Sequence, residues 1–376
     1  MGWSPRKANR RIPLIADRPP SLAFGMAQTE FKLVLSGGGL KGLSHVGVLL
    51  ALEERGLVPS LVVGSSMGAM VAATWATGMS GAEMRERAMQ VKRRHVFAVA
   101  HADMALRRMH APAVYRREPL ELLLDGLVAN LTFRELPRQL LVNTVDLNSG
   151  AQVLWGLPGL DDVRVADAVF ASCALPGILP PRLIRGRYYV DGAVVENLPL
   201  RIAASAGHGP IIAVNLNPLG PFDLERSDTE LQGFAATYIR GLEMVMQAQS
   251  AEGLRFWQSP PLILVQPRVG HISMFAFDRT AELIEEGYRS MSAALDLVGS
   301  LEQLGPGIHP RRPVRITVEA EKCVGCGACT LWAPEVFKMG GDGLAHVVAQ
   351  VHQWSPVDGT YVSHCPTHAI HVEHSG

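Results

Sequence analysis

The feature that most constrains the fold is a repeated pattern of apolar strand, glycine-containing turn and helix near the start of the chain. The first copy predicts a strand over 31–36, a run of glycines and a helix over about 41–55. The second copy predicts a strand over 61–65 and a helix over 67–77. Strands that alternate with helices at this spacing form a parallel sheet covered by helices. The pattern therefore predicts an α/β fold class for this part of the chain.

Similar signals continue downstream, and with 376 residues the chain is long enough for about two domains. Further strands are predicted over 139–145, 152–155, 187–190, 211–215 and 262–265, further helices over 163–172, 229–254 and 280–298, and irregular helical structure over 83–130. A segment rich in Gly and Pro then predicts a linker. The expected division is a disordered extension over 1–30 (Met26 is an alternative start to Met1), a large domain over 31–300, a linker over 301–313 and a small domain over 314–376.

Charge and hydropathy exclude some classes of protein. Lys+Arg and Asp+Glu are equal at 35 each, so global charge does not indicate a nucleic-acid partner. Residues 56–82 contain no charged side chain, which raises the alternative of a membrane span. Pro59, Gly64 and Thr77 are among the residues that interrupt this segment, so a strand, a turn and a helix describe it better than a transmembrane segment.

The N-terminal region has basic residues but no apolar run of the kind found in a secretory signal. Several unpaired thiols favour a reducing compartment. We therefore expect a cytoplasmic protein, and peripheral attachment to a membrane stays open.

The first candidate for catalysis is Ser66, which lies in a G-x-S-x-G sequence between the second strand and its helix. A sharp turn at such a place lifts the serine hydroxyl above the sheet, and the small residues Gly64 and Gly68 let strand and helix approach closely. An ordinary Gly/Ser turn is the alternative for this motif taken alone.

The first glycine run, Gly37–Gly39, also follows a strand and is succeeded by Lys41 and Gly42. Its spacing fits a dinucleotide-binding fingerprint, but that fingerprint needs an acidic residue at the end of the next strand. The sequence has Val63, Gly64 and Ser65 there. The better interpretation is an oxyanion hole, in which backbone N–H groups bind an oxyanion beside the serine.

A third element is Asp191, which ends the predicted strand 187–190 and is followed by Gly192. A carboxylate in this position is often part of a simple turn, but it is also a candidate general base. A histidine base is the alternative, and His45, His208 and His271 are the candidates within the large domain.

These elements, in this order, resemble the patatin-like phospholipase family over about residues 31–300. The segments 171–176, 188–193 and 197–199 (ASCALP, YYVDGA and NLP) are similar to the second half of that family's pattern. The resemblance implies a three-layer α/β/α domain that hydrolyses lipid acyl esters with a Ser–Asp dyad. It implies the following roles: Ser66 as nucleophile, Asp191 as general base, Gly37, Gly38 and Gly39 as oxyanion donors, Lys41 at the family's basic position, and Gly42, Gly64, Gly68 and Gly192 as supporting residues.

Residues 91–117 carry a net charge of +6. Such a segment fits anionic lipid headgroups, because each basic residue near an anionic bilayer contributes about 1 kcal/mol. A solvated helix face is the equally simple alternative. A phospholipid ester, at an anionic membrane surface, is the expected partner class.

Four of the five cysteines lie in the last 54 residues, as Cys323, Cys326, Cys329 and Cys365. This spacing is typical of the ligands of an iron–sulfur cluster. Zinc is the main alternative, although structural zinc sites usually present two separated C-x-x-C pairs, and a disulfide framework is less consistent with the pattern. The remaining cysteine, Cys173, is expected to be a small buried apolar residue.

From residue 314 onward the chain resembles a small single-cluster ferredoxin of the α+β class. Strands over 314–318 and 369–372 and the segment PEVF at 334–337 carry the likeness together with the cysteines. The resemblance implies one [4Fe–4S] cluster held by the four cysteines. Two-cluster ferredoxins have a further Cys before a Pro, but here Ala333 precedes Pro334, so a second cluster is not expected.

Two functions follow from these patterns. The first is a lipid acyl hydrolase whose cluster senses redox state or docks an electron-transfer partner, and the net charge of −3 in the small domain suits a basic partner. The second is an electron-transfer or scaffold protein in which the hydrolase domain is a catalytically silent binding module.

Overall fold

The fold is described from a computed structural model, which defines residues 30–100, 113–217, 234–349 and 351–374. The expectations for residues 1–29, for Met26 and for part of the basic segment (Asp103, Arg107 and Arg108) lie outside these ranges.

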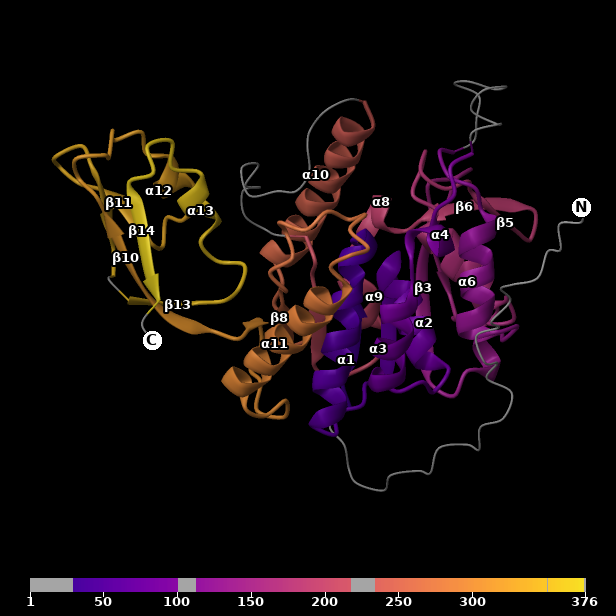
Figure 1. The fold of residues 1–376 in the computed structure, drawn as a ribbon. Helices are drawn as coiled ribbons and strands as arrows, with labels where there is room; N and C mark the ends of the chain where they lie inside the picture. The colour runs from indigo at the N-terminus through magenta and orange to yellow at the C-terminus, as the bar shows by residue number, and fades with distance from the viewer. Residues whose placement is uncertain (1–29, 101–112, 218–233, 350, 375–376) are drawn as a thin grey trace, which may run out of the picture.

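A nine-stranded sheet organises the larger part of the chain (Figure 1). Its strands are β1 (Lys32–Leu35), β2 (Leu61–Ser65), β3 (Gln139–Asp146), β4 (Gln152–Trp155), β5 (Arg182–Ile184), β6 (Arg187–Asp191), β7 (Ile211–Val214), β8 (Leu262–Val265) and β9 (Ile308–His309). They follow the order β5-β6-β3-β2-β1-β7-β8-β9, with β4 also paired to β3. The six strands from β3 to β9 in this order are parallel, while β4 and β6 each pair antiparallel with β3, and β5 pairs antiparallel with β6. The predicted α/β class is confirmed.

Helices cover the sheet and connect its strands. They are η2 (Gly39–Leu43), α1 (Ser44–Glu54), α2 (Met67–Ala76), α3 (Gly81–Gln90), α4 (Arg93–Val96), α6 (Glu118–Val128), η4 (Phe133–Glu135), α7 (Val165–Cys173), α8 (Ala193–Glu196), α9 (Leu200–Ser205), α10 (Phe234–Arg255) and α11 (Thr280–Val298).

Alternation along the strands produces two separate cores, because successive side chains point to opposite faces of a sheet. Leu33 and Leu35 of β1 pack into the larger core with helices such as α1, α2 and α7. Val34 packs on the other face with Leu200 of α9 and Leu254 of α10. Both faces of the sheet are therefore covered, which confirms the three-layer α/β/α arrangement.

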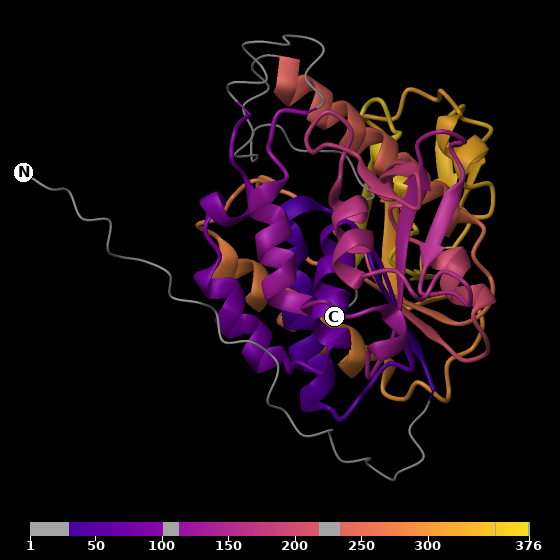
Figure 2. The ribbon, with the colours of Figure 1, turned by 90° about the vertical axis from the view of Figure 1, so that its right-hand side faces the viewer.

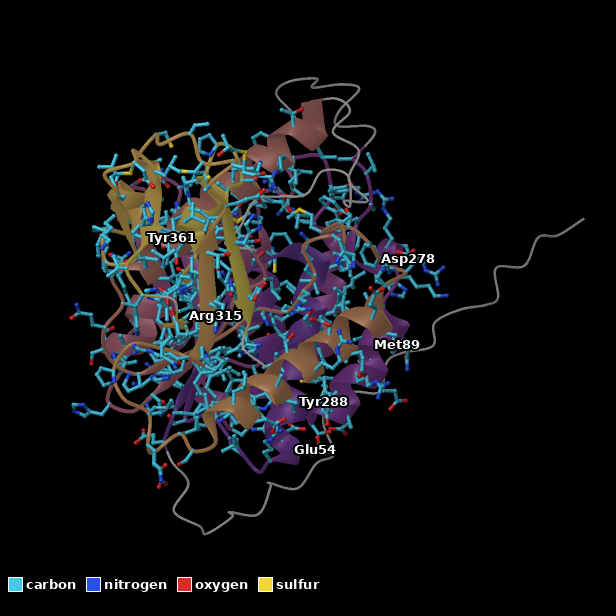
Figure 3. The ribbon with its side chains drawn as sticks, turned by 90° about the vertical axis from the view of Figure 1, so that its left-hand side faces the viewer. Glu54, Met89, Asp278, Tyr288, Arg315 and Tyr361 are labelled. Carbon is cyan, nitrogen blue, oxygen red and sulfur yellow. The ribbon has the colours of Figure 1, made fainter. Side chains whose placement is uncertain are left out.

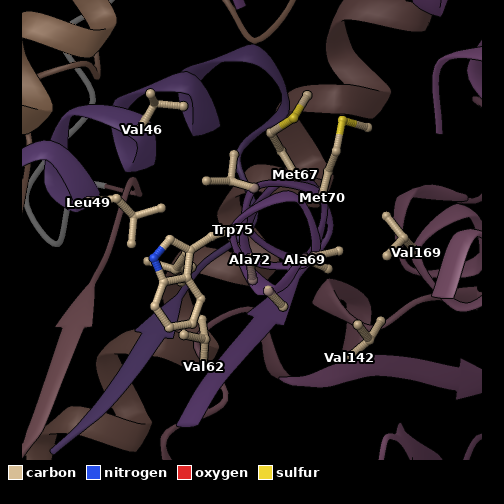
Figure 4. Packing of buried hydrophobic residues seen from close by; sticks show 14 of the residues in the cluster. Val46, Leu49, Val62, Met67, Ala69, Met70, Ala72, Trp75, Val142 and Val169 are labelled. Atoms are coloured by element: carbon tan, nitrogen blue, oxygen red, sulfur yellow. The ribbon is translucent and has the colours of Figure 1, made fainter. Parts of the chain in front are cut away.

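Helix α2 is buried along its whole length in the larger core. Trp75 is 2% exposed and lies between Leu49 of α1 and Val62 of β2 (Figure 4). The Arg138 guanidinium stacks on the Trp75 ring at 4.2 Å. Burial of large apolar side chains at this contact fixes α2 against β2, and with it the turn that connects them.

Most predicted elements are confirmed in type, with changes at their ends. The helix predicted from 41 begins as the 3-10 helix η2 at Gly39, and the region 83–130 contains α3, α4 and α6 in its described part. The short elements β5, α8 and α9 were not predicted, because three to six residues are too few to show a periodic pattern. Residues 56–82 divide into β2 and α2. No helix in the described ranges combines the length and apolar character needed to cross a bilayer.

The predicted linker 301–313 is partly ordered, because β9 pairs with β8 and extends the main sheet. The chain then enters a small module at the β9 end of that sheet, on the opposite side of the molecule from β5 and β6 (Figures 1 and 2). Its elements are β10 (Arg312–Val318), α12 (Ala328–Trp332), β11 (Phe337–Met339), β12 (Ala345–Val347), β13 (Val351–Trp354), α13 (Thr360–Ser363) and β14 (Ile370–His374). Strands β13, β10 and β14 form an antiparallel sheet over a core of its own.

Helices α1 and α11 approach each other so closely that glycine is needed on both. A Cβ atom on Gly47 would lie 1.8 Å from the Ile284 carbonyl oxygen, and one on Gly287 would lie 1.9 Å from the Ser44 carbonyl oxygen. At the far end of the same contact, the Tyr288 hydroxyl donates to Glu54 (Figure 3).

We predict that Gly287→Ala lowers the stability of the main domain by about 1–3 kcal/mol, because backbone atoms cannot yield to the added methyl group. The matched control is Gly253→Ala in α10, where no atom lies within 4 Å of the added Cβ. That change is expected to be neutral or to stabilise by up to about 1 kcal/mol through helix propensity. Thermal unfolding of both variants measures the difference, and equal melting temperatures would contradict the close contact.

Candidate active site

Ser66 occupies a strained bend between β2 and α2. Its backbone has φ 54° and ψ −126°, a combination that residues other than glycine rarely adopt. The Ser66 carbonyl oxygen accepts hydrogen bonds from the N–H groups of Ala69 (2.9 Å) and Met70 (3.2 Å), which begin the helix directly after the bend. The serine therefore lies at the N-terminus of α2, where developing negative charge is stabilised.

The glycines predicted to support this bend are required by close contacts with neighbouring backbone and side-chain atoms. A Cβ atom on Gly64 would lie 2.5 Å from the Ala69 Cα, and one on Gly68 would lie 2.3 Å from the Leu35 carbonyl oxygen. On Gly42 it would lie 2.2 Å from the Met67 Cγ, and on Gly192 2.5 Å from the Asn143 carbonyl oxygen. Larger residues at these positions would push η2, β2, α2 and the turn after β6 apart.

Sheet register brings Asp191 to this bend across 125 residues of sequence. Ser65 of β2 is paired with Asn143 of β3, and the next residue of β3, Thr144, is paired with Asp191 at the end of β6. Strand β6 runs antiparallel to β3 but pairs only with its last three residues, so the last residue of β6 lies at the carboxyl edge of the parallel strands. Asp191 and Ser66, the residue after Ser65, consequently meet at one edge of the sheet.

The Asp191 carboxyl is buried and hydrogen-bonded. Burial raises its pKa to about 7, against the opposing effects of the Ala193 N–H, which donates to Oδ1 at 2.9 Å, and of the nearby Ser66 hydroxyl. A carboxyl with this pKa exchanges its proton near neutral pH. Ser66 and Asp191 thus form a hydroxyl–carboxylate pair without an intervening imidazole.

The three glycines after β1 do not have equivalent positions. The Gly37 N–H donates to Asn197 Oδ1 at 3.1 Å, and the Leu40 N–H donates to the Met274 carbonyl oxygen at 2.9 Å. Gly38 and Gly39 line a cavity together with Ser66, and no hydrogen bond from their N–H groups is found within the described residues. Of the predicted oxyanion donors, these two have N–H groups available, and that of Gly37 is used by Asn197.

Lys41 lies under α10 and is not part of the cavity lining. Its ammonium is buried 3.7 Å from the carboxylate of Glu243, and burial lowers its pKa although the Glu243 charge opposes the shift. The lysine therefore ties the glycine loop to α10 through a buried ion pair.

None of the three candidate histidines lines the cavity. His45 is fully buried 2.9 Å from the Ser36 carbonyl oxygen, and burial lowers its pKa to about 4, so it is neutral near pH 7. His271 lies 3.5 Å from the Glu282 carboxylate, and His208 is exposed.

The cavity above the Ser66–Asp191 pair is narrow, about 70 Å³, and mainly apolar. Its other lining residues are Met67, Met70, Val96, Phe97, Leu120, Cys173, Leu175, Ile178, Leu179, Ala193, Met246, Met274 and Phe275. Cys173 is half-buried, and burial together with the nearby Asp191 raises the pKa of its thiol, which makes it a poor nucleophile. The contribution of α10 through Met246 was not predicted, because no motif marks it.

A second cavity, in the small module, is lined by all four predicted cluster cysteines. Cys326 is exposed and the other three are partly buried. Burial raises the pKa of the Cys329 thiol, assisted by the charges of Cys323 and Cys326. For Cys365 burial acts in the same direction, but hydrogen bonds from the Ala369 N–H (3.3 Å to Sγ) and from Thr367 outweigh it, so the pKa is lowered. Four thiols converging on one cavity fit an iron–sulfur cluster.

Within the described ranges, no group of three or more His, Cys, Asp or Glu side chains is arranged to hold a single metal ion.

Comparison with known families assigns both regions. Residues 33–204 match the model of the patatin-like phospholipases, and residues 318–372 match that of the 4Fe-4S single cluster domain of ferredoxin I. The chain contains a patatin-like phospholipase domain followed by a single-cluster ferredoxin domain. Both resemblances inferred from the sequence are confirmed.

The chain is also similar to several known proteins. An uncharacterized NTE family protein of Mycobacterium tuberculosis is 26% identical over 303 residues, which are 75% of this chain and 49% of the relative. Patatin-like phospholipase domain-containing protein 6 of Mus musculus is 30% identical over 218 residues, 57% of this chain and 15% of the relative. The chain thus spans about half the length of the mycobacterial relative and a smaller share of the mouse relative. VipD of Legionella pneumophila has a TM-score of 0.41 at 16% identity, covering 72% of this chain and 67% of VipD.

Proposed function

We propose that the protein is a serine acyl hydrolase that cleaves carboxylic esters of lipids, with phospholipids as the substrate class. The observation that carries this proposal is the buried carboxyl of Asp191 beside the Ser66 hydroxyl, with both residues lining one apolar cavity. A hydroxyl beside a buried carboxylate supplies a nucleophile and its base, and the apolar lining suits an acyl chain.

The chemistry follows from the positions of these groups. Asp191 accepts the Ser66 proton as the hydroxyl oxygen attacks the acyl carbon, and the proton then passes to the leaving alcohol. The N–H groups of Gly38 and Gly39, with the N-terminus of α2, are placed to stabilise the oxyanion. Water then hydrolyses the acyl-enzyme by the reverse route. The pKa of about 7 suits Asp191 for both proton transfers near neutral pH.

Charge around the cavity supports a lipid surface as the site of action. Three exposed basic residues, Lys92, Arg93 and Arg94, lie close to the cavity in sequence. They come after helix α3 and before the cavity residues Val96 and Phe97. Exposed Arg116 and Arg117 belong to the neighbouring segment, in which the Arg116 N–H donates to the Ala98 carbonyl oxygen at 2.8 Å, although the Arg116 side chain pairs with Glu118. A basic rim beside an apolar cavity favours peripheral binding to an anionic membrane.

We also propose that Cys323, Cys326, Cys329 and Cys365 hold one [4Fe–4S] cluster, as the second cavity and the family match support. Such a cluster supplies one-electron redox chemistry, which ester hydrolysis does not use. Its role is therefore regulatory, or it serves a separate electron-transfer partner. Exposed Val324 and Leu331, close in sequence to the cysteines, suit the docking of such a partner.

Redox sensing is favoured by α10, a helix that contacts both modules. At its C-terminal end the Arg255 guanidinium lies 5.4 Å from the ring of Trp332, three residues after Cys329. Near the middle of the helix Glu243 pairs with Lys41 of the glycine loop, and Met246 lines the catalytic cavity. A change at the cysteine loop has a continuous physical route to the catalytic site through this helix.

The test of the proposed activity uses Ser66→Ala and Asp191→Asn on phospholipid and p-nitrophenyl esters. Each variant is expected to lose at least about 10³-fold in kcat/KM, because each removes one member of the reacting pair. Wild-type kcat/KM should rise with pH up to about 7 and level off above it, because Asp191 acts as a base only when deprotonated. Undiminished hydrolysis by Ser66→Ala, or a midpoint near pH 4, would contradict the proposal.

The cluster assignment predicts brown protein after anaerobic purification, with broad absorption near about 400 nm. Cys365→Ala should lose this absorption. Cys173→Ala is the matched control and should retain it, because Cys173 lines the other cavity. Colourless wild-type protein with one equivalent of zinc would refute the assignment.

Redox sensing predicts that the hydrolysis rate differs between oxidised and reduced cluster, by about 5-fold or more if the coupling has a typical strength. Arg255→Ala should reduce this difference without loss of the cluster absorption. Arg185→Ala, at an exposed turn between β5 and β6, is the control that should keep it. Identical rates in both cluster states would eliminate sensing and leave partner docking.

A further inference from the structure

Two buried polar side chains lie behind the candidate active site and are not part of its cavity lining. Ser172, at the end of α7, is 0% exposed. Its hydroxyl accepts the backbone N–H of Ser66 at 2.9 Å and donates to the Asn143 carbonyl oxygen at 2.7 Å. A hydroxyl has one hydrogen to donate, so these two bonds fix its orientation.

Asn197, at the end of α8, is 1% exposed and its Oδ1 accepts the Gly37 N–H. Gly37 is enclosed between this amide and the nucleophile. A Cβ atom on Gly37 would lie 2.6 Å from Asn197 Oδ1 and 2.9 Å from Ser66 Cβ. The first residue of the glycine loop is thereby held directly against the side of Ser66.

Asn143 connects the two side chains. Its carbonyl oxygen accepts from Ser172, while its side-chain Nδ2 donates at 2.8 Å to the carbonyl oxygen of Glu196, the residue before Asn197. Because Asn143 is a buried residue of β3, both contacts are anchored in the centre of the main sheet.

From these contacts we infer that Ser172 and Asn197 are positioning residues of the hydrolase, an inference that rests on the proposed function. Ser172 holds the Ser66 backbone in its strained conformation, so that the hydroxyl of Ser66 reaches Asp191. Asn197 occupies the Gly37 N–H and fixes the loop, so that the N–H groups of Gly38 and Gly39 stay beside the acyl carbon. One residue acts on the nucleophile and the other on the oxyanion site.

The two roles predict different kinetic signatures. Ser172→Ala should lower kcat by about 10- to 100-fold through misplacement of the nucleophile. It should also move the midpoint of the pH profile upward, because the Ser66 hydroxyl beside Asp191 lowers the pKa of that carboxyl. Asn197→Ala should lower kcat by a similar factor with an unchanged midpoint, since the Ser66–Asp191 pair is left intact. KM should change little in either variant.

Ser44→Ala is the matched control, because Ser44 is also fully buried but its hydroxyl has no hydrogen-bond partner among the described residues. It should keep kcat within about twofold of the wild type. The isosteric pair Ser172→Thr and Ser172→Val separates the hydroxyl from side-chain size. Thr should keep the wild-type midpoint and Val should shift it. Equal kinetics for Thr and Val, or for Ser44→Ala and Ser172→Ala, would overturn the role of Ser172.

Amide hydrogen exchange makes failure of this inference distinguishable from failure of the proposed function. Exchange at Ser66 should be faster in Ser172→Ala, and exchange at Gly37 should be faster in Asn197→Ala, whether or not esters are cleaved. Wild-type protein without esterase activity would refute the proposed function alone. Unchanged exchange at these two amides would refute the inference even in an active enzyme. An Asn197→Ala enzyme with wild-type kcat would refute the role of Asn197.

Discussion

The structure depends on a tight bend in which a serine is held with positive φ between a buried strand and a buried helix. This conformation costs about 1–3 kcal/mol at a residue other than glycine, so its surroundings must enforce it. Gly64 and Gly68 allow backbone contacts that no larger residue permits, and burial of Trp75 fixes the helix against the sheet. The hydroxyl of Ser66 is consequently presented at one edge of the sheet, and the remaining features of the site are arranged around it.

The charge of the second member of the pair is controlled by burial. Asp191 reaches Ser66 through two successive strand pairings, and its environment has few groups that stabilise a carboxylate. Its pKa therefore rises into the range where a carboxyl can act as a base and then as an acid. The buried histidine His45 follows the same rule in the opposite direction, since burial holds it neutral. In the proposed mechanism, proton transfer near neutral pH therefore requires only the Asp191 carboxyl group.

The sequence allowed prediction of the parts of the site that lie where a strand changes into a turn. Ser66, Asp191 and the four cysteines carry signals in their immediate neighbours, and the structure places each group around one cavity. The use of the Gly37 N–H by Asn197 could not be predicted, because it depends on a contact across 160 residues. The same holds for α10, whose contacts with Lys41 and Trp332 arise from its length and path and not from a motif.

The central claim is that the hydroxyl oxygen of Ser66 is the nucleophile of an acyl transfer and that Asp191 activates it. The most direct measurement is mass mapping of the protein after treatment with a fluorophosphonate carrying an acyl-like chain, because this reagent forms a stable bond with an activated serine. The account predicts one adduct, on the peptide that contains Ser66, and strong loss of labelling in Asp191→Asn. Labelling of a different serine, or rapid labelling of Ser66 in the absence of the Asp191 carboxylate, would contradict it.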